Sequence, residues 1–341
     1  MNIPQEPTPV SRKNNFDLLR LLFATGVVFS HSFSSLGFEE PIVWNRSLGN
    51  FCVHGFFVIS GYLISNSFIR MPAVVPFLVN RTLRIVPALI IALLLTDWLA
   101  SVSQFFSKNP IPYISNGPIW TLTWEAACYG LVAIFGVTGV LTTATMPAVF
   151  VTIWIAYLLK TGDSTPAYDV IAPMVLMFVM GAFIRVFQER INFSKIIVPS
   201  FLMFVVSFSA DTASPVLNAI SQHVPFLWAP AIGQWDIMRI LYLASFPFIV
   251  IYLGLNAPVP WQSKTDVSYG VYIFAWPISQ TIIFFSIKQG LSFNPYTLFL
   301  AVMAITLPVS WLSWTLVEKP AMRLKIRRMP DRGESDPSAV T

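Results

Sequence analysis

The sequence has few charged residues. Of its 341 residues, 11% are charged and 55% are hydrophobic, whereas soluble domains carry about 25% charged residues. Cysteine is also scarce. The two cysteines, Cys52 and Cys128, both fall in apolar runs and make no disulfide framework, so we expect two buried structural thiols. The shortage of charge excludes a soluble globular domain and predicts an integral membrane protein.

The apolar runs are long enough to form membrane-spanning helices, each of which needs about 20 mostly apolar residues. They do not alternate in character, as the lipid-facing strands of a membrane barrel would. We therefore predict an all-α fold, a polytopic membrane helical bundle of about ten transmembrane helices. The predicted spans are residues 17–37, 51–69, 82–100, 119–140, 145–160, 168–187, 194–210, 237–255, 268–288 and 296–317.

The charges between these runs are distributed unevenly. Ten spans place both termini on one side, and the segments on that side hold fifteen Lys and Arg residues against four on the other. Because cytoplasmic loops carry an excess of Lys and Arg, we expect both termini to be cytoplasmic. The first sixteen residues lack the short apolar core of a cleavable signal peptide, so we expect the first helix to remain as an anchor.

No separate soluble domain is predicted. Residues 1–16 form a cytoplasmic segment, residues 17–320 the membrane domain, and residues 321–341 a tail that begins basic and ends polar. We expect the basic part of the tail to lie on anionic lipid headgroups and the rest to be disordered. The net charge is +5, and the excess of Lys and Arg lies in the predicted cytoplasmic segments, as membrane topology requires. The positive charge therefore does not indicate a nucleic-acid partner, and none is expected.

The first apolar run contains three polar residues, Asp17, Arg20 and His31. An Asp or Arg at the centre of a membrane helix costs roughly 2.5 to 3.5 kcal/mol on insertion scales. Arg20 and His31 are eleven residues apart, close to three helical turns, so they share one face and lie about 16 Å apart along the axis. Asp17 can pair with Arg20. Alternatively, Arg20 reaches the headgroups and His31 makes an interhelical hydrogen bond, but the shared face favours a functional role.

Three further features carry polar or small residues in apolar surroundings. Arg81 and Arg84, one turn apart, can hold a phosphate through charge-assisted hydrogen bonds, although ordinary positive-inside anchoring also explains them. Glu125 shares the depth of His31, so the pair can act as a base and its orienting or proton-accepting partner; a structural hydrogen bond is the alternative. Ser60 and Gly61 are expected to let two helix backbones pack closely.

Six stretches carry a resemblance to a known family. In chain order they are FDLLRLL with His31 following Arg20 after ten residues, FFVISGYLI, RTLRIVP, PIWTLTWEAACY, DVSYGVYIFAWPISQ and LVEKP. They run from residue 16 to residue 320 and resemble the motifs of the acyltransferase 3 family, ten-helix membrane enzymes that acylate bacterial surface polysaccharides, O-antigens and Nod factors. Ala275 and His54 stand where many relatives have a histidine and an acidic residue, respectively. The chain resembles the stand-alone type, without an added periplasmic domain.

The resemblance implies a transferase in the bacterial cytoplasmic (inner) membrane that moves an acyl group, expected to be acetyl, from cytoplasmic acetyl-CoA to a hydroxyl of a glycan or lipid-linked sugar. Arg81 and Arg84, with Arg20 nearby, would hold the CoA phosphates, and no metal is expected. An extended pantetheine arm is of the same order of length as the roughly 16 Å between Arg20 and His31 along the helix axis. His31 would act as general base or as transient acyl carrier, which the sequence leaves open. Glu125 and Asp17 complete the candidate catalytic set.

The outer segment 211–236 is rich in proline and tryptophan. We expect it to fold over the outer mouth of the bundle and, with the Asp236–Arg239 pair, to shape the acceptor entrance. Trp228 and Trp235 would stack on sugar rings there, although capping the bundle is the alternative.

The rival function is a membrane exporter of an acylated or sugar-like solute, which would use the same polar residues as a permeation path without catalysis. A membrane scaffold is a third possibility. Membrane lipids surround the chain in each case.

Overall fold

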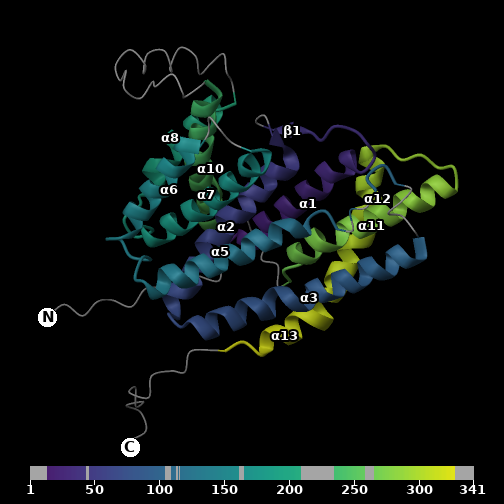
Figure 1. The fold of residues 1–341 in the computed structure, drawn as a ribbon, viewed down its shortest axis with the longest axis horizontal. Coiled ribbons are helices and arrows are strands. Elements are labelled where there is room, and N and C mark those ends of the chain that lie inside the picture. Colours follow the sequence, from purple (N-terminus) through teal and green to yellow (C-terminus); the bar gives the residue numbers. More distant parts are fainter. Residues whose placement is uncertain are drawn as a thin grey trace, which may run out of the picture.

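The computed structural model describes residues 14–43, 46–103, 109–112, 114, 116–160, 165–208, 234–257 and 265–326. Within these residues the chain is almost entirely helical (Figure 1). Ten α-helices have 14 or more residues: α1 (Phe16–Ser34), α2 (Leu48–Arg70), α3 (Val74–Ser103), α5 (Ile119–Val137), α6 (Met146–Lys160), α7 (Pro166–Val186), α8 (Phe193–Val206), α10 (Gln234–Asn256), α11 (Ser268–Lys288) and α12 (Pro295–Ser313).

Short elements complete the described chain. A two-stranded hairpin, β1 (Ile42–Val43) and β2 (Arg46–Ser47), connects α1 to α2. After α12 the chain continues as a π-helical turn, η2 (Trp314–Glu318), and a short helix, α13 (Lys319–Arg323). The predicted all-α bundle is therefore confirmed.

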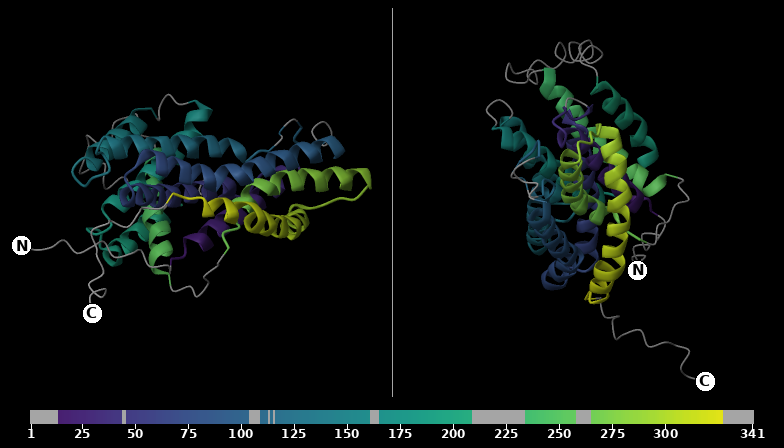
Figure 2. Two further views of the ribbon diagram at one scale, coloured as in Figure 1. Left: turned by 90° about the horizontal axis from the view of Figure 1, so that it is seen from below. Right: turned by 90° about the vertical axis from the view of Figure 1, so that its right-hand side faces the viewer.

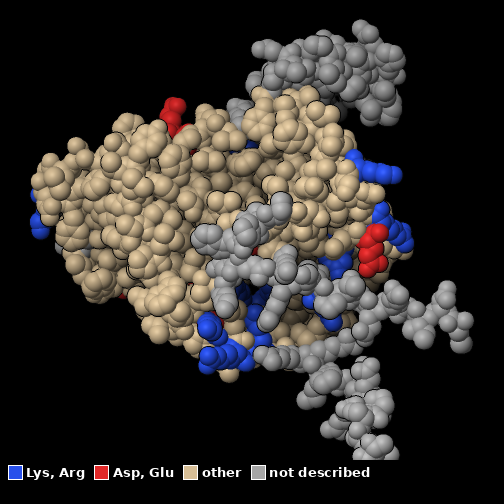
Figure 3. Space-filling view, turned by 180° about the vertical axis from the view of Figure 1, so that it is seen from behind, with Lys and Arg blue, Asp and Glu red and all other residues tan. Residues whose placement is uncertain are grey.

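Eight of the described helices are long and apolar enough to cross a membrane. The other two, α6 and α8, have 15 and 14 residues, fewer than the roughly 20 that a straight crossing needs. The surface is correspondingly apolar: the face in Figure 3 is mostly tan, with Lys and Arg gathered at its lower and right-hand edges. Cys52 and Cys128 are buried free thiols, as predicted.

The long helices run side by side in an elongated bundle (Figure 2). In it, α2 packs against α1, α5 and α7. A Cβ added at Gly61 would overlap the Phe178 carbonyl oxygen, and one added at Gly181 would overlap the Val58 carbonyl oxygen. The predicted packing role of Gly61 is therefore confirmed, because only glycine lets α2 and α7 approach this closely.

Both ends of the described chain lie at the same end of the bundle. The Asn15 side chain donates hydrogen bonds to the carbonyls of Leu253 and Ala257, where α10 ends. Asn80, near the start of α3, exchanges two hydrogen bonds with the backbone of Ile326. This end also holds the start of α11 and the end of α2. The functional side chains below are positioned relative to it.

Candidate functional site

A large cavity opens among the helix ends that gather at this end of the bundle. Its volume is about 800 Å³, and its walls come from α1, α2, α3, α5, α11 and the segment after α12. Eight charged residues line it: Arg20, Arg70, Arg81, Arg84 and Lys325, with Asp17, Glu125 and Asp266. We call this space the inner cavity. Five positive groups against three negative ones make it suitable for an anionic ligand.

Asp266 organises the arginines of the inner cavity. It lies just before α11, and its carboxylate forms ion pairs with Arg84 and, at 3.5 Å, with Arg20. Burial alone would raise the pKa of Asp266, but the charges of Arg84 and Arg20 outweigh it and lower the pKa. Among the described residues, the ion pair of Arg20 is with Asp266, while Asp17, the partner predicted from the spacing, interacts with the charge of Arg20 without forming an ion pair with it. Sequence spacing indicates neighbours on one helix only, and this partner comes from another element.

Arg81 makes a different set of contacts. Its guanidinium donates a 2.8 Å hydrogen bond to Ser67 Oγ, and its buried Nε has no hydrogen-bond partner among the described residues. Ser67 and Arg81 both line the inner cavity. An unpaired donor on a cation at a cavity wall is a group that a bound anion satisfies.

The segment after α13 closes one side of the inner cavity. Lys325 and Ile326 line it, as does Met322, and Arg84 lies 3.4 Å from the sulfur of Met322. Burial, together with the charges of Arg84 and Arg81, lowers the pKa of Lys325 to about 8. The described start of the tail lies against the cavity and is held by Asn80, while the contact of the basic tail with lipid headgroups stays a prediction.

Glu125 faces the inner cavity from α5. Its Oε1 accepts hydrogen bonds from Ser60 Oγ at 3.0 Å and from Tyr129 Oη at 2.6 Å. The predicted pairing of Glu125 with His31 is therefore wrong. Ser60, which we expected to serve packing, is a hydrogen-bond donor in the cavity, while its neighbour Gly61 makes the helix contact.

His31 lies near the other end of α1, and its carboxylate partner is Glu40. The distance from His31 Nδ1 to Glu40 Oε1 is 2.9 Å, and Ser30 and Ser34 also donate to the Glu40 carboxylate, at 2.7 and 2.8 Å. Burial would raise the pKa of Glu40, but these three hydrogen bonds and the histidine charge lower it to about 2. The Trp276 ring meets the imidazole edge to face at 5.5 Å. The imidazole is thus fixed through Nδ1.

A second, much smaller pocket adjoins His31. It is lined by residues of α1 and α11 and by Pro118, just before α5: Val27, Val28, His31, Ser32, Ser35, Pro118, Tyr272, Ala275, Trp276 and Ser279. We call it the histidine pocket. Tyr272 lines the inner cavity as well, so one side chain borders both spaces.

The predicted acceptor residues are only partly described. Arg239, near the start of α10, forms an ion pair with Asp169 Oδ1 at 3.2 Å; its predicted pairing with Asp236 stays a prediction. Trp228 lies outside the described residues. Trp235 and Asp236 belong to the first turn of α10 rather than to a loop, and their side chains are outside the described part of the structure.

Sequence reasoning missed three polar residues of these sites: Glu40, Asp266 and Lys325. Each has a signal in the sequence. Glu40 is an acidic residue shortly after His31, Asp266 opens one of the six motif stretches, and Lys325 follows the last one. Among the described residues, no group of three or more His, Cys, Asp or Glu side chains is placed to hold a metal ion.

Comparison with known proteins gives consistent matches over nearly the whole chain. A family model described as an acyltransferase domain matches residues 13–315. An O-acetyl transferase of Shigella phage Sf6 is 29% identical over 348 residues, covering 90% of this chain and 96% of the phage protein. Nodulation protein 10 of Rhizobium leguminosarum bv. viciae is 28% identical over 374 residues, covering 94% and 96%. No solved structure matches significantly.

Proposed function

The chain belongs to the acyltransferase 3 family, and from that premise we propose that it transfers an acetyl group from cytoplasmic acetyl-CoA to a hydroxyl of a glycan, such as an exopolysaccharide, an O-antigen or a lipid-linked sugar. It is a membrane O-acyltransferase. The donor, the acceptor and the bacterial inner membrane as its location are the parts we propose. The relative named O-acetyl transferase supports acetyl as the group transferred.

One observation carries this proposal: the cationic inner cavity and His31 lie at the two ends of the same helix face. Arg20 lines the cavity near the start of α1, and His31 follows eleven residues later on that helix, about 16 Å along its axis. A CoA held by its phosphates in the cavity has a pantetheine arm of the same order of length. The thioester then reaches the histidine without the whole donor crossing the membrane.

The donor end of the site is built from cations. Arg81, Arg84 and Arg20 would bind the phosphates, with Lys325 as a fourth positive group at the cavity wall. Asp266 holds two of these arginines in place. Among the described residues, the Arg81 guanidinium is engaged by a hydrogen bond to Ser67 and forms no ion pair, so a phosphate can bind it without displacing a carboxylate.

At the other end, His31 would act on the acceptor hydroxyl. When Nδ1 donates its proton to Glu40, the Nε2 lone pair is available as a base. The acceptor oxygen bonds to the thioester carbonyl carbon, its proton passes to Nε2, the C–S bond breaks, and the CoA thiolate takes up a proton. Alternatively, Nε2 itself accepts the acetyl group before passing it to the acceptor. Glu40 positions the imidazole in either route.

Glu125 and Asp17 have proposed roles on the inner side. Both line the inner cavity, where Glu125 would orient the pantetheine arm through its hydrogen-bonded group with Ser60 and Tyr129. Asp17 would balance the arginine charge. At the outer side, Trp228, Trp235, Asp236 and Arg239 remain the proposed acceptor-binding residues.

The test is acyl transfer by the purified protein in detergent, with radiolabelled acetyl-CoA and surface glycan prepared from cells that lack the gene. Label appearing on the glycan supports the enzyme. An exporter needs two compartments and leaves the label on CoA under these conditions. Mass spectrometry of surface glycans from cells with and without the gene then identifies the acceptor sugar and the acylated position.

A further inference from the structure

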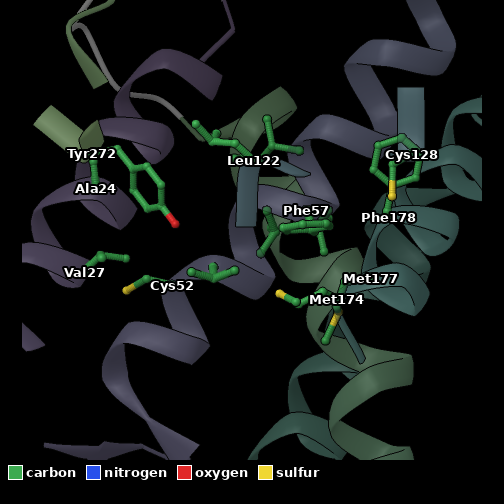
Figure 4. Close-up of a cluster of buried hydrophobic side chains, with 14 of the residues drawn as sticks. Ala24, Val27, Cys52, Phe57, Leu122, Cys128, Met174, Met177, Phe178 and Tyr272 are labelled. Atoms are coloured by element: carbon green, nitrogen blue, oxygen red, sulfur yellow. The ribbon is translucent and has the colours of Figure 1, made fainter. Parts of the chain in front are cut away.

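Tyr272 lies between the inner cavity and the histidine pocket. It is the one described residue that lines both spaces, and it is buried, with 7% of the residue exposed. Figure 4 draws its ring on the same side of the buried cluster as Ala24 and Val27 of α1, with the hydroxyl directed toward the cluster. Tyr272 is therefore the described side chain that stands at the boundary between the cavity and the pocket of His31.

The ring is held by contacts on both sides of the boundary. Its hydroxyl lies 2.7 Å from Thr121 Oγ1 and 3.4 Å from the Pro118 carbonyl oxygen, both of α5 or the residues just before it. Thr121 lines the inner cavity and Pro118 the histidine pocket. The Phe56 ring meets it edge to face at 5.5 Å. Tyr272 therefore spans from α11 to α5 across the junction of the two spaces.

The histidine pocket is small in this state. Its volume of about 10 Å³ is about that needed for a single water, too little for an acetyl group, whereas the adjoining cavity of about 800 Å³ has room for a displaced ring. An acetyl group that enters the histidine pocket from the inner cavity needs space that the Tyr272 ring occupies, and every further methylene of a longer acyl chain needs more of it.

We propose that Tyr272 is a movable partition between the donor cavity and the histidine pocket and that it sets the upper limit on acyl-chain length. This inference rests on the proposed function, because it takes the acyl donor to bind in the inner cavity. It assigns the Tyr272 ring a role in specificity.

The chain offers a matched control one turn earlier. Tyr269 is also on α11 and also partly buried, and its hydroxyl donates to the Ile85 carbonyl oxygen at 3.1 Å. It lines the inner cavity but not the histidine pocket. Tyr269→Ala removes a ring of the same size from the same helix without opening the boundary.

The experiment measures kcat/KM of purified wild type and variants with acetyl-, propionyl- and butyryl-CoA. One methylene is typically discriminated about 10- to 200-fold by a fitted pocket, and we expect the wild type to lose activity in that range at each step. Tyr272→Ala should reduce the acetyl-to-propionyl ratio at least about tenfold, while Tyr272→Phe and Tyr269→Ala keep the wild-type ratio. Tyr272→Leu, which preserves apolar packing, should show an intermediate ratio and serves if the alanine variant does not fold.

The outcomes separate the two proposals. If the wild type transfers no acyl group from any CoA, the proposed function fails. If the wild type is active but folded Tyr272→Ala and Tyr272→Leu keep its chain-length ratio, the partition is wrong while the proposed function stands. A ratio that falls equally in Tyr269→Ala would also overturn the partition, because it would assign chain length to the inner cavity as a whole.

Discussion

At the scale of single residues, the contact between His31 and Glu40 orients the imidazole for the proposed chemistry. The carboxylate is hydrogen-bonded by the imidazole and by two serines, which is why its pKa falls to about 2 from an ordinary value of 4.5. With a depressed folded-state pKa, the stabilisation from these contacts is fully present above pH 4.5 and is lost as the pH falls toward 2. Glu40 is therefore ionised throughout the neutral range in which an assay is run.

Glu40→Gln should lower kcat and leave the KM for acetyl-CoA near the wild-type value, because the change removes a charge-assisted hydrogen bond that orients His31 and touches no part of the donor cavity. Such a bond contributes about 1.5 to 3 kcal/mol, or roughly a 10- to 150-fold change. Initial rates at saturating donor measure it. Glu39→Gln is the control, since Glu39 is exposed. Equal kcat values in the two variants would contradict the orienting role.

Donor binding and chemistry should respond to different substitutions. Arg84→Ala removes a cavity cation and should raise the KM for acetyl-CoA about 10- to 150-fold while leaving turnover at saturating donor, and Arg20→Ala should resemble it. His31→Ala should lower kcat about 10²- to 10⁴-fold with donor binding preserved. Binding of labelled acetyl-CoA and initial rates distinguish the two patterns. A near-wild-type kcat in His31→Ala would contradict the role of His31 in the chemistry. The shared face of Arg20 and His31 would then serve helix packing alone.

At the scale of elements, the close contact of α2 and α7 should depend on Gly61. Gly61→Ala places a methyl group against the Phe178 carbonyl, and overpacking of this kind costs typically 1 to 3 kcal/mol. Gly130→Ala is the matched control, because an added Cβ at Gly130 meets no atom within 4 Å. Thermal unfolding in detergent should show a lower midpoint for the first variant and an unchanged or higher one for the second. Equal unfolding midpoints for Gly61→Ala and Gly130→Ala would mean that α2 and α7 accommodate the added methyl group without loss of stability.

The segment after α13 should act as part of the donor site. Lys325→Ala should raise the KM for acetyl-CoA, and Asn80→Ala should do the same by releasing the backbone of Ile326. The double variant should be little worse than either single one, because both act through one contact. Since the pKa of Lys325 is about 8, its charge is lost as the pH rises through 8, and the wild-type KM should rise between pH 7 and pH 9.

Two variants test the assignment to Lys325. Lys325→Arg should abolish the pH dependence of KM over this range, because arginine stays charged. Arg323→Ala, at an exposed position nearby, should leave the KM unchanged. A larger rise in KM for Arg323→Ala than for Lys325→Ala would contradict the assignment of the donor contact to Lys325.

At the scale of the whole molecule, the sequence was sufficient for the positions and order of the ten long helices that the structure describes, of which eight are long and apolar enough to span a membrane, but not for their contacts. Runs of apolar residues define spans directly, and the spacing of Arg20 and His31 correctly gives one helix separated by about three turns. The partners of charged residues, however, come from other elements: Asp266 for Arg20 and Arg84, and Glu40 for His31. Helical spacing holds no information on such contacts, and it did not indicate that Tyr272 borders two spaces.

The orientation of the molecule in the membrane determines whether the inner cavity faces cytoplasmic acetyl-CoA. Both described chain ends lie at the end that holds the inner cavity, and acetyl-CoA is made in the cytoplasm, so this end should be cytoplasmic, in agreement with the fifteen-to-four charge asymmetry. Since Cys52 and Cys128 are buried, a single introduced cysteine at an exposed position can be labelled selectively with a membrane-impermeant maleimide. Glu39→Cys, near His31, and Arg323→Cys, near the inner cavity, report on the two ends.

In intact spheroplasts, Glu39→Cys should react at once, whereas Arg323→Cys should react only after the membrane is permeabilised. The unmodified protein, with its two buried thiols, supplies the background. The opposite labelling pattern would place the five cations of the inner cavity outside the cell, away from any CoA thioester. It would then remove the donor assignment of Arg20, Arg81 and Arg84, even if the helices and their contacts were unchanged.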